Sequence, residues 1–217
     1  MSSYTTILWD MDGVLMDSEP QHYRAWKRTL FELFGATELP WDLYKPCIGA
    51  RYERLSGILR ENYGLDIEPQ SVRSYYQETL RKLEEEEGYF LTEGMIEVLQ
   101  ALRARGYKMA IASSSPVSAI ERFTEATGIT GYFDLLFSGE AVKHSKPAPD
   151  TFLEAAKRLH SAPEACIVVE DSENGAKAAK AANMACIGYV NPGSGTQDLS
   201  AADRLISDMR TLPSILL

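Results

Sequence analysis

The sequence predicts an α/β fold, a doubly wound three-layer core around a parallel sheet, with an all-helical cap domain inserted into it. Two repeated patterns predict the core. Short apolar segments rich in β-branched and aromatic residues recur along the chain, each bounded by polar residues, Gly or Pro, which is typical of buried parallel strands. Amphipathic segments of helical period lie between them, and this alternation is typical of a parallel sheet covered on both faces. A third pattern, a long helical stretch directly after the first strand, predicts the insertion.

The predicted elements of the core follow in chain order. The strands are expected at residues 5–10, 108–115, 134–139, 165–172 and 184–190. The helices are expected at residues 94–106, 116–128, 149–160 and 172–183. In the first of these helices Met95, Leu99 and Leu102 recur at i+3 and i+4 spacing, and Gly106 is a typical C-terminal stop.

Residues 17–91 break this alternation. They contain Leu, Arg, Glu, Tyr and Trp at helical spacing and no convincing strand, so we expect three or more helices, at residues 22–35, 51–64 and 69–88. A helical block between the first strand and the rest of the sheet is most simply an inserted domain. We therefore expect residues 1–16 and 92–217 to form the catalytic core and residues 17–91 to form the cap. We expect hinges near Met16–Glu19 and Gly88–Glu93.

The composition is that of a globular protein, and it excludes several classes. The net charge of −9 over 217 residues argues against nucleic acid as a partner, since binding to a phosphate backbone needs a basic surface. The N-terminal segment has no basic region, and its apolar run is too short for a signal peptide or a membrane span. Cys47, Cys166 and Cys186 form no CxxC pair, so we expect reduced cysteines rather than disulfides or a zinc site. We expect a cytoplasmic monomer with no membrane partner.

Chemically active side chains follow four of the predicted strands. They are Asp10 and Asp12 after the first strand, Ser113 and Ser114 after the second, Lys146 after the third, and Glu170 and Asp171 after the fourth. Because ligands of open α/β sheets bind at the carboxyl ends of the strands, we expect these side chains to converge. Each could instead be a cap or turn residue, since Asp and Ser are favoured at helix N-termini, and Ser172 fits that alternative.

The acidic cluster indicates a metal ion and a phosphorylated ligand. Carboxylates this close together disfavour one another's ionised form, so they need a cation. Oxygen ligands with nearby water suit Mg²⁺, and the metal with Lys146 would leave room for an anionic phosphoryl group. Aspartate is one of the side chains that accept a phosphoryl group, and such transfer depends mainly on in-line positioning and charge neutralisation. We therefore expect a small phosphorylated metabolite as the ligand.

The segments DMDGVLMDS, IASSS, SKPAPD and VVEDSENG, in this order, resemble the four motifs of the haloacid dehalogenase-like hydrolase superfamily. The resemblance covers essentially the whole chain, and the place of the insertion resembles the helical-cap subfamily related to β-phosphoglucomutase and sugar-phosphate phosphatases. It implies that Asp10 is the nucleophile and a Mg²⁺ ligand, and that Asp12 is the general acid and base, with its backbone carbonyl on the metal. It further implies that Ser113, the amide of Ser114 and Lys146 hold the phosphoryl oxygens. Asp171 would ligate the metal, and Glu170 would either ligate it or orient a bound water.

The residues at the strand ends differ from several other known motifs. An EF-hand loop also begins Asp-x-Asp, but here Val14 and Leu15 occupy positions that need an oxygen ligand and glycine. NPGSGTQD falls short of GxGxxG, and the chain has no Walker A, HExxH or GxSxG motif. A non-enzymatic phosphoacceptor signalling domain uses similar residues but has no cap, and a true dehalogenase would not need Asp12 for proton transfer. A catalytically inactive binding protein on this fold stays an alternative.

The segment HYRAWK resembles β-phosphoglucomutase, in which residues matching His22 and Trp26 serve the hinge and the sugar pocket. The resemblance implies substrate-related roles for these two side chains. The same spacing of His, Ala and Trp also describes a core-facing helix stripe, so both interpretations stay open.

A second segment, PCIGARYER, favours a phosphatase over the mutase. The mutase carries Lys-Gly-x-x-Arg there, whereas this chain aligned on Gly49 has Ile48 and Tyr52 at the two cationic positions and Arg51 one position off. An apolar Ile cannot bind a second phosphate. We therefore expect a Mg²⁺-dependent phosphatase of small phosphorylated sugars or related phosphomonoesters, acting through an aspartyl-phosphate, with β-phosphoglucomutase as the alternative.

Overall fold

The structure, a computed structural model, describes residues 4–35, 38–45, 52–65, 69–193 and 197–216, with the backbone alone for residues 52–56 and 69–71. The chain divides into two compact units. The core unit consists of Met1–Asp17, Phe90–Pro192 and Gln197–Leu217, and the helical unit consists of Ser18–Tyr89 with Gly193–Thr196. The functions expected of them, catalytic core and cap, stay predictions.

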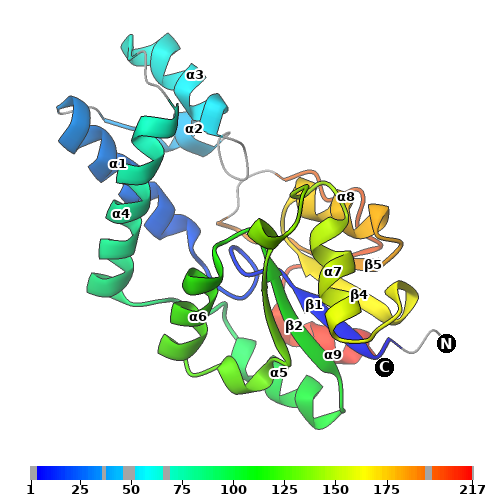
Figure 1. The fold of residues 1–217 in the computed structure, drawn as a ribbon. Helices are drawn as coiled ribbons and strands as arrows, with labels where there is room; N and C mark the ends of the chain where they lie inside the picture. Colours follow the sequence, from blue (N-terminus) through cyan, green and yellow to red (C-terminus); the bar gives the residue numbers. More distant parts are fainter. Residues whose placement is uncertain (1–3, 36–37, 46–51, 66–68, 194–196, 217) are drawn as a thin grey trace. The chain divides into compact units, whose positions relative to one another are not determined.

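The core unit contains a six-stranded parallel sheet in the order β3-β2-β1-β4-β5-β6 (Figure 1). The strands are β1 (Thr6–Trp9), β2 (Lys108–Ser113), β3 (Leu135–Ser138), β4 (Cys166–Glu170), β5 (Ala185–Tyr189) and β6 (Arg204–Ile206). In the middle of the sheet, Ile7 of β1 is paired with Met109 of β2 on one side and Ile167 of β4 on the other. The order of the strands reverses at β1, and the carboxyl ends at such a reversal are the usual ligand site of open α/β sheets.

The predicted α/β class is confirmed, and one strand was missed. The first five strands lie where the apolar segments predict them. The sixth, β6, has only three residues, of which Arg204 and Leu205 are exposed and Ile206 is buried. A strand this short at the edge of a sheet has no apolar run or alternation long enough to predict it.

Helices cover both faces of the sheet. The four predicted core helices are α5 (Met95–Ala104), α6 (Val117–Ala126), α7 (Asp150–Arg158) and α8 (Glu173–Ala181), and a short α9 (Leu212–Ile215) was not predicted. Short 3₁₀ helices lie at Thr130–Tyr132, Gly139–Ala141, Pro163–Ala165 and Met209–Thr211. Residues of α7 and α8 share one buried cluster with Leu8, Ala110 and Val168 of the sheet. Figure 1 shows α5 and α6 on the opposite side, as right-handed crossovers require.

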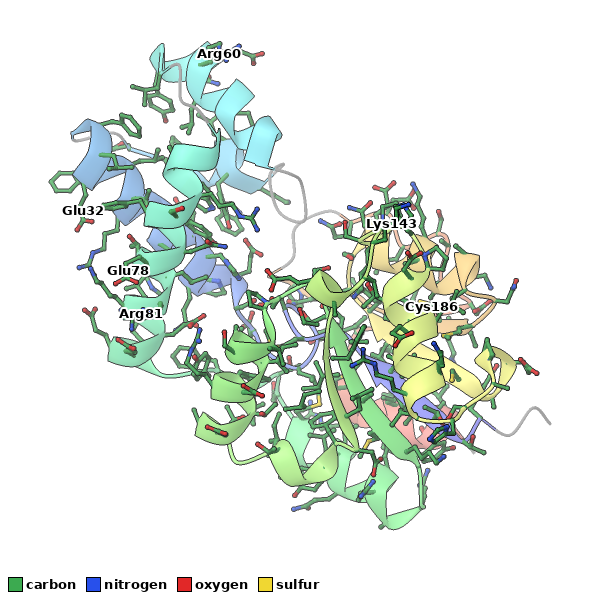
Figure 2. The ribbon with its side chains drawn as sticks, viewed as in Figure 1. Glu32, Arg60, Glu78, Arg81, Lys143 and Cys186 are labelled. Carbon is green, nitrogen blue, oxygen red and sulfur yellow. The ribbon has the colours of Figure 1, made fainter. Side chains whose placement is uncertain are left out.

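Two cysteines are part of this core. Cys166 and Cys186 are buried free thiols, and Figure 2 labels Cys186. Burial raises the pKa of the Cys166 thiol to about 11 and that of Cys186 to about 12. Such thiols are poor nucleophiles and poor metal ligands. Cys47 lies outside the described residues.

The helical unit contains α1 (Glu19–Phe34), α2 (Trp41–Tyr44), α3 (Tyr52–Tyr63) and α4 (Pro69–Glu87). Its buried cluster includes Ala25, Trp26 and Leu30 from α1 and Val72, Tyr76 and Leu83 from α4. Ion pairs line the exposed side of these helices: Arg28 of α1 pairs with Glu86 of α4 at 3.6 Å, and Glu78 pairs with Arg81 on α4 at 2.8 Å (Figure 2). Exposed pairs contribute ~0–1 kcal/mol each, so the apolar cluster is the main stabilising contact.

Two segments at the edge of the core unit lead to and from the helical unit, and they lie side by side. Met16 and Leu91 form an antiparallel bridge, the backbone N–H of Asp17 donates to the carbonyl of Phe90 at 2.9 Å, and that of Thr92 donates to Leu15 at 3.0 Å. These bonds tie the two crossings together where the sequence predicts hinges. Within the described parts of the chain, no helix is long and apolar enough to cross a membrane.

Candidate active site

Asp10 lies at the carboxyl end of the central strand β1 and begins a tight loop. Its backbone N–H continues the sheet ladder by donating to the carbonyl of Val169 at 3.0 Å. The chain then turns: the carbonyl of Met11 accepts from the N–H groups of residues 14, 15 and 16, and Gly13 has a φ of 78°. A φ in this left-handed region favours glycine. The turn keeps Asp10 and Asp12 at the end of the strand, with Asp10 only 8% exposed and Asp12 partly buried.

Lys146 joins the ends of two strands through its ammonium group. Its Nζ donates to Asp10 Oδ1 at 2.6 Å and to Glu170 Oε1 at 2.8 Å. It also lies over the ring of Phe152, 4.6 Å from the ring centroid. The side chains of Lys146 and Glu170 are 6% and 1% exposed. A buried cation with two carboxylate partners is held firmly, because losing either partner would leave a buried charge uncompensated.

The charges at this site perturb one another's protonation. Burial raises the pKa of Asp10 to about 7, opposed by the Lys146 ammonium and reinforced by the carboxylates of Glu170 and Asp12. The pKa of Lys146 is raised despite its burial, because Asp10 and Glu170 favour the charged ammonium. Strong perturbation by burial and specific charge partners is typical of functional sites.

Glu170 is fixed by the start of helix α8. Its Oε2 accepts from both the backbone N–H and the hydroxyl of Ser172, each at 2.8 Å. Ser172 is also the N-cap of α8, since its hydroxyl oxygen accepts from the N–H of Gly175 at 3.0 Å. The carboxylate packs directly against Gly175, where an added Cβ would lie 1.6 Å from Glu170 Oε1. The cap function of Ser172 could be anticipated from the sequence, whereas the need for glycine at 175 could not.

The serines after β2 are placed differently from one another. Ser113 is buried, and its Oγ accepts from the N–H of Ser115 at 3.0 Å, while Ser114 is exposed. The hydroxyl of Ser115 donates to Asp12 Oδ2 at 2.7 Å. Sequence reasoning did not assign a function to Ser115, although it lies at the same strand end.

A fifth strand end also reaches the site. Asn191 follows β5, is 7% exposed, and donates from Nδ2 to the carbonyl of Gly13 at 2.8 Å. It begins the NPGSGTQD segment, which falls short of the GxGxxG pattern of a nucleotide-binding loop. Its place directly after the fifth predicted strand is the sequence signal that could have identified it.

Three buried carboxylates could hold a metal ion. Asp10, Glu170 and Asp171 each offer an oxygen, and these oxygens lie within 4.8 Å of one another. Oxygen-only ligands from carboxylates suit Mg²⁺, and this many buried acids with one lysine need a further positive charge. The donor set therefore fits the predicted magnesium ion. The side chain of Asp12 is not part of this group, and its predicted contribution to the metal was its backbone carbonyl.

The helical unit holds the remaining predicted residues. His22 is partly exposed and its Nδ1 shares a hydrogen bond with the hydroxyl of Tyr76. Trp26 is 7% exposed and stacks on Tyr76 with ring centroids 4.2 Å apart, so it packs within the apolar cluster of the unit. Gly49 and Arg51, like Ile48, lie outside the described residues, and Tyr52 is described by its backbone alone, at the start of α3.

Comparison with known proteins agrees with this geometry. The family profile described as haloacid dehalogenase-like hydrolase matches residues 4–183. The chain is 31% identical to the fructose-1-phosphate phosphatase YqaB of Escherichia coli over 183 residues, 83% of this chain and 94% of that protein. It is 31% identical to a phosphorylated carbohydrates phosphatase of Thermotoga maritima over 186 residues, 82% of this chain and 81% of that protein.

Solved structures give the same result. The crystal structure of a putative β-phosphoglucomutase from Thermotoga maritima is similar with a TM-score of 0.77 and 29% identity, covering 97% of both chains. The profile match spans most of the chain, and relatives above 30% identity cover more than four fifths of it. The chain with Asp10, Asp12, Lys146 and the Glu170–Asp171 pair at its strand ends therefore belongs to the haloacid dehalogenase-like hydrolase family, as its motifs predicted.

Proposed function

We propose that this protein is a Mg²⁺-dependent phosphatase that hydrolyses phosphomonoesters of sugars or related small metabolites through an aspartyl-phosphate on Asp10. The observation that carries the proposal is the buried Asp10 carboxylate at the end of β1, held by Lys146 and surrounded by Glu170 and Asp171. The names of two relatives, a fructose-1-phosphate phosphatase and a phosphorylated carbohydrates phosphatase, support phosphorylated sugars as the substrate class.

In the proposed reaction, an oxygen of Asp10 attacks phosphorus and the bond between phosphorus and the ester oxygen breaks. Asp12 gives a proton to the departing alcohol oxygen. It then takes a proton from a water that attacks the aspartyl-phosphate, the bond between Asp10 and phosphorus breaks, and inorganic phosphate leaves. Splitting the reaction into two displacements on a carboxylate is a recognised form of nucleophilic catalysis.

The other residues stabilise and orient the phosphoryl group. Lys146 donates to Oδ1 of the proposed nucleophile Asp10, and its ammonium would neutralise negative charge on the equatorial oxygens of the phosphoryl group. Ser113 and the amide of Ser114 would donate to the same oxygens. Magnesium, held by Asp10, Asp171 and Glu170 with the carbonyl of Asp12, would supply the additional positive charge.

The mutase is the second candidate, because a structural relative is described as a putative β-phosphoglucomutase. A mutase must exclude water from the aspartyl-phosphate and hold a second phosphate with cationic groups. The residues that decide this, Ile48, Gly49 and Arg51, lie outside the described part of the chain. The apolar Ile48 at a cationic position favours hydrolysis.

Phosphate release from a panel of phosphorylated sugars and small alcohols, with Mg²⁺ or with excess chelator, tests the proposal. We expect hydrolysis that requires Mg²⁺ and that Asp10→Asn abolishes, since the amide does not accept a phosphoryl group. Glu164→Gln is the matched control, because this exposed carboxylate precedes β4 at the opposite edge of the sheet. Residual activity of Asp10→Asn within about tenfold of the wild type would remove Asp10 from the nucleophile role.

The same preparation distinguishes the two candidate activities. With β-glucose 1-phosphate, Mg²⁺ and a trace of the bisphosphate, we expect free phosphate to accumulate faster than glucose 6-phosphate. The reverse result would identify a mutase and make Arg51 the candidate cation for the second phosphate.

A further inference from the structure

Asp12 receives a hydrogen bond from the neighbouring strand end. The hydroxyl of Ser115 donates to its Oδ2 at 2.7 Å, across 103 positions of sequence. The two residues follow β1 and β2, which are paired in parallel, with Trp9 opposite Ile111. Both side chains are partly buried, so the bond is shielded from some of the competition with water.

The hydroxyl of Ser115 is not needed for the turn that contains it. That turn is closed by the backbone N–H of Ser115, which donates to Ser113 Oγ at 3.0 Å. Removing the hydroxyl therefore leaves the contact with Ser113 intact. The Ser115 hydroxyl is hydrogen-bonded to Asp12, so we expect its removal to act on that carboxyl group.

Gly13, the residue after Asp12, is held from the half of the sheet that lies beyond β4. Asn191, at the end of β5, donates from Nδ2 to the carbonyl of Gly13 at 2.8 Å, and both residues are buried. The N–H of Gly13 donates in turn to the carbonyl of Met16 at 2.8 Å. Both backbone groups of Gly13, its N–H and its carbonyl, are therefore hydrogen-bonded. The side chain of Asp12 is held separately, by the hydroxyl of Ser115.

We propose that Ser115 and Asn191 are positioning residues for Asp12, setting its carboxyl group in one orientation for proton transfer to the leaving alcohol. The inference rests on the proposed function of Asp12 as general acid and base. A carboxyl oxygen that accepts from a hydroxyl is the poorer site for the proton, so the proton passes to the alcohol from Oδ1. Proton transfer requires heavy atoms within hydrogen-bond reach, and a carboxyl group free to rotate meets that condition less often.

The test compares substrates that do and do not need the proton. Sugar phosphates release an alkoxide that must be protonated, whereas 4-nitrophenyl phosphate releases a stable phenolate. For Ser115→Ala we expect kcat/KM, which reports formation of the aspartyl-phosphate and not its later hydrolysis by water, to fall about tenfold on a sugar phosphate, a fraction of the ~10²–10⁴-fold supplied by a general acid. On 4-nitrophenyl phosphate we expect a change below about twofold. Ser115→Thr keeps the hydroxyl and should restore the sugar phosphate rate.

Ser118→Ala is the matched control, since Ser118 is exposed on α6, three positions further along the chain. Asn191→Ala should show the same selective loss as Ser115→Ala. If its buried position prevents folding, Ser115→Ala and Ser115→Thr decide alone. An equal loss on both substrates, no loss at all, or no recovery in Ser115→Thr would overturn the positioning of Asp12.

Asp12→Ala separates this inference from the proposed function. If Asp12→Ala loses activity selectively on sugar phosphates but Ser115→Ala does not, the positioning inference fails and the proposed function stands. If Asp12→Ala loses activity equally on both substrates, its function as general acid fails, and the positioning inference fails with it. In the double variant Asp12→Ala/Ser115→Ala we expect no loss beyond that of Asp12→Ala, because Ser115 acts through Asp12.

Discussion

Substitution of Gly175 by alanine should disrupt the active site from a position that takes no part in the reaction. A Cβ at residue 175 would lie 1.6 Å from Glu170 Oε1, 1.8 Å from Cδ and 2.4 Å from Oε2. Gly175 is not among the residues with positive φ, so alanine brings no backbone strain and the effect is one of space alone. Glu170 must therefore move away.

The cost of this movement follows from the contacts of Glu170. The carboxylate is 1% exposed, pairs with Lys146 at 2.8 Å, and accepts two hydrogen bonds from Ser172 at 2.8 Å. Breaking a buried ion pair costs ~3–5 kcal/mol. Alanine in place of glycine within helix α8 returns about 1 kcal/mol. We expect a net loss of ~2–4 kcal/mol in the free energy of unfolding of the core unit, or on the order of 10 °C in Tm for a chain of this size.

Activity should fall as well, because Lys146 loses one of the two carboxylates that hold it. Misplacement of a catalytic group by about 1 Å costs roughly 10²-fold in rate, and we expect a loss of that order in kcat/KM for phosphate release. Urea unfolding followed by circular dichroism, and phosphate release with Mg²⁺, measure the two effects.

Gly131→Ala is the matched control. An added Cβ there has no atom within 4 Å, and residue 131 has no positive φ, so stability should change by less than about 0.5 kcal/mol. A Gly175→Ala protein as stable and as active as Gly131→Ala would refute the argument, since it would mean that Glu170 can leave Gly175 without losing contacts that matter.

Two further predictions concern side chains in contact with Lys146, the carboxyl group of Asp10 and the ring of Phe152. In excess chelator, Asp10→Asn should gain stability relative to the wild type as pH rises from 5 to 8. Burial raises the pKa of Asp10 from 3.8 to about 7, and the stability that this raised pKa provides is lost as pH rises through that value. Urea unfolding at each pH measures the difference, and a difference that stays constant would contradict the perturbed pKa. Phe152→Leu should lower kcat/KM about tenfold and weaken inhibition by inorganic phosphate, because the ring lies 4.6 Å from Lys146 Nζ and a desolvated cation–π contact contributes up to ~2 kcal/mol. Unchanged phosphate inhibition in a folded variant would show that the ring does not hold the ammonium group.

The sequence alone predicted the fold class, the first five strands with the four long helices of the core unit, and the polar residues that follow four of the strands. Apolar periodicity is a local property, and in a parallel sheet every strand delivers its carboxyl end to the same edge. The sequence therefore predicted that Asp10 and Lys146 lie close together, although 136 positions separate them. In the structure, Lys146 Nζ is 2.6 Å from Asp10 Oδ1. The rule that parallel strands end at one edge of the sheet does not predict which carboxylate oxygen accepts from which hydrogen-bond donor.

Tertiary structure decided the contacts that orient the site. The bond from Ser115 to Asp12, the support of Gly13 by Asn191 and the fit of Glu170 against Gly175 all depend on side-chain directions and on spacing between strands. Strand β6 was not predicted, because three residues are too few to show the alternation of buried and exposed side chains. Its pairing with β5 is a contact between segments that are not adjacent in the sequence. Periodicity reports which face of an element is buried, whereas atomic contacts are set by packing between elements, and only the folded chain determines that packing.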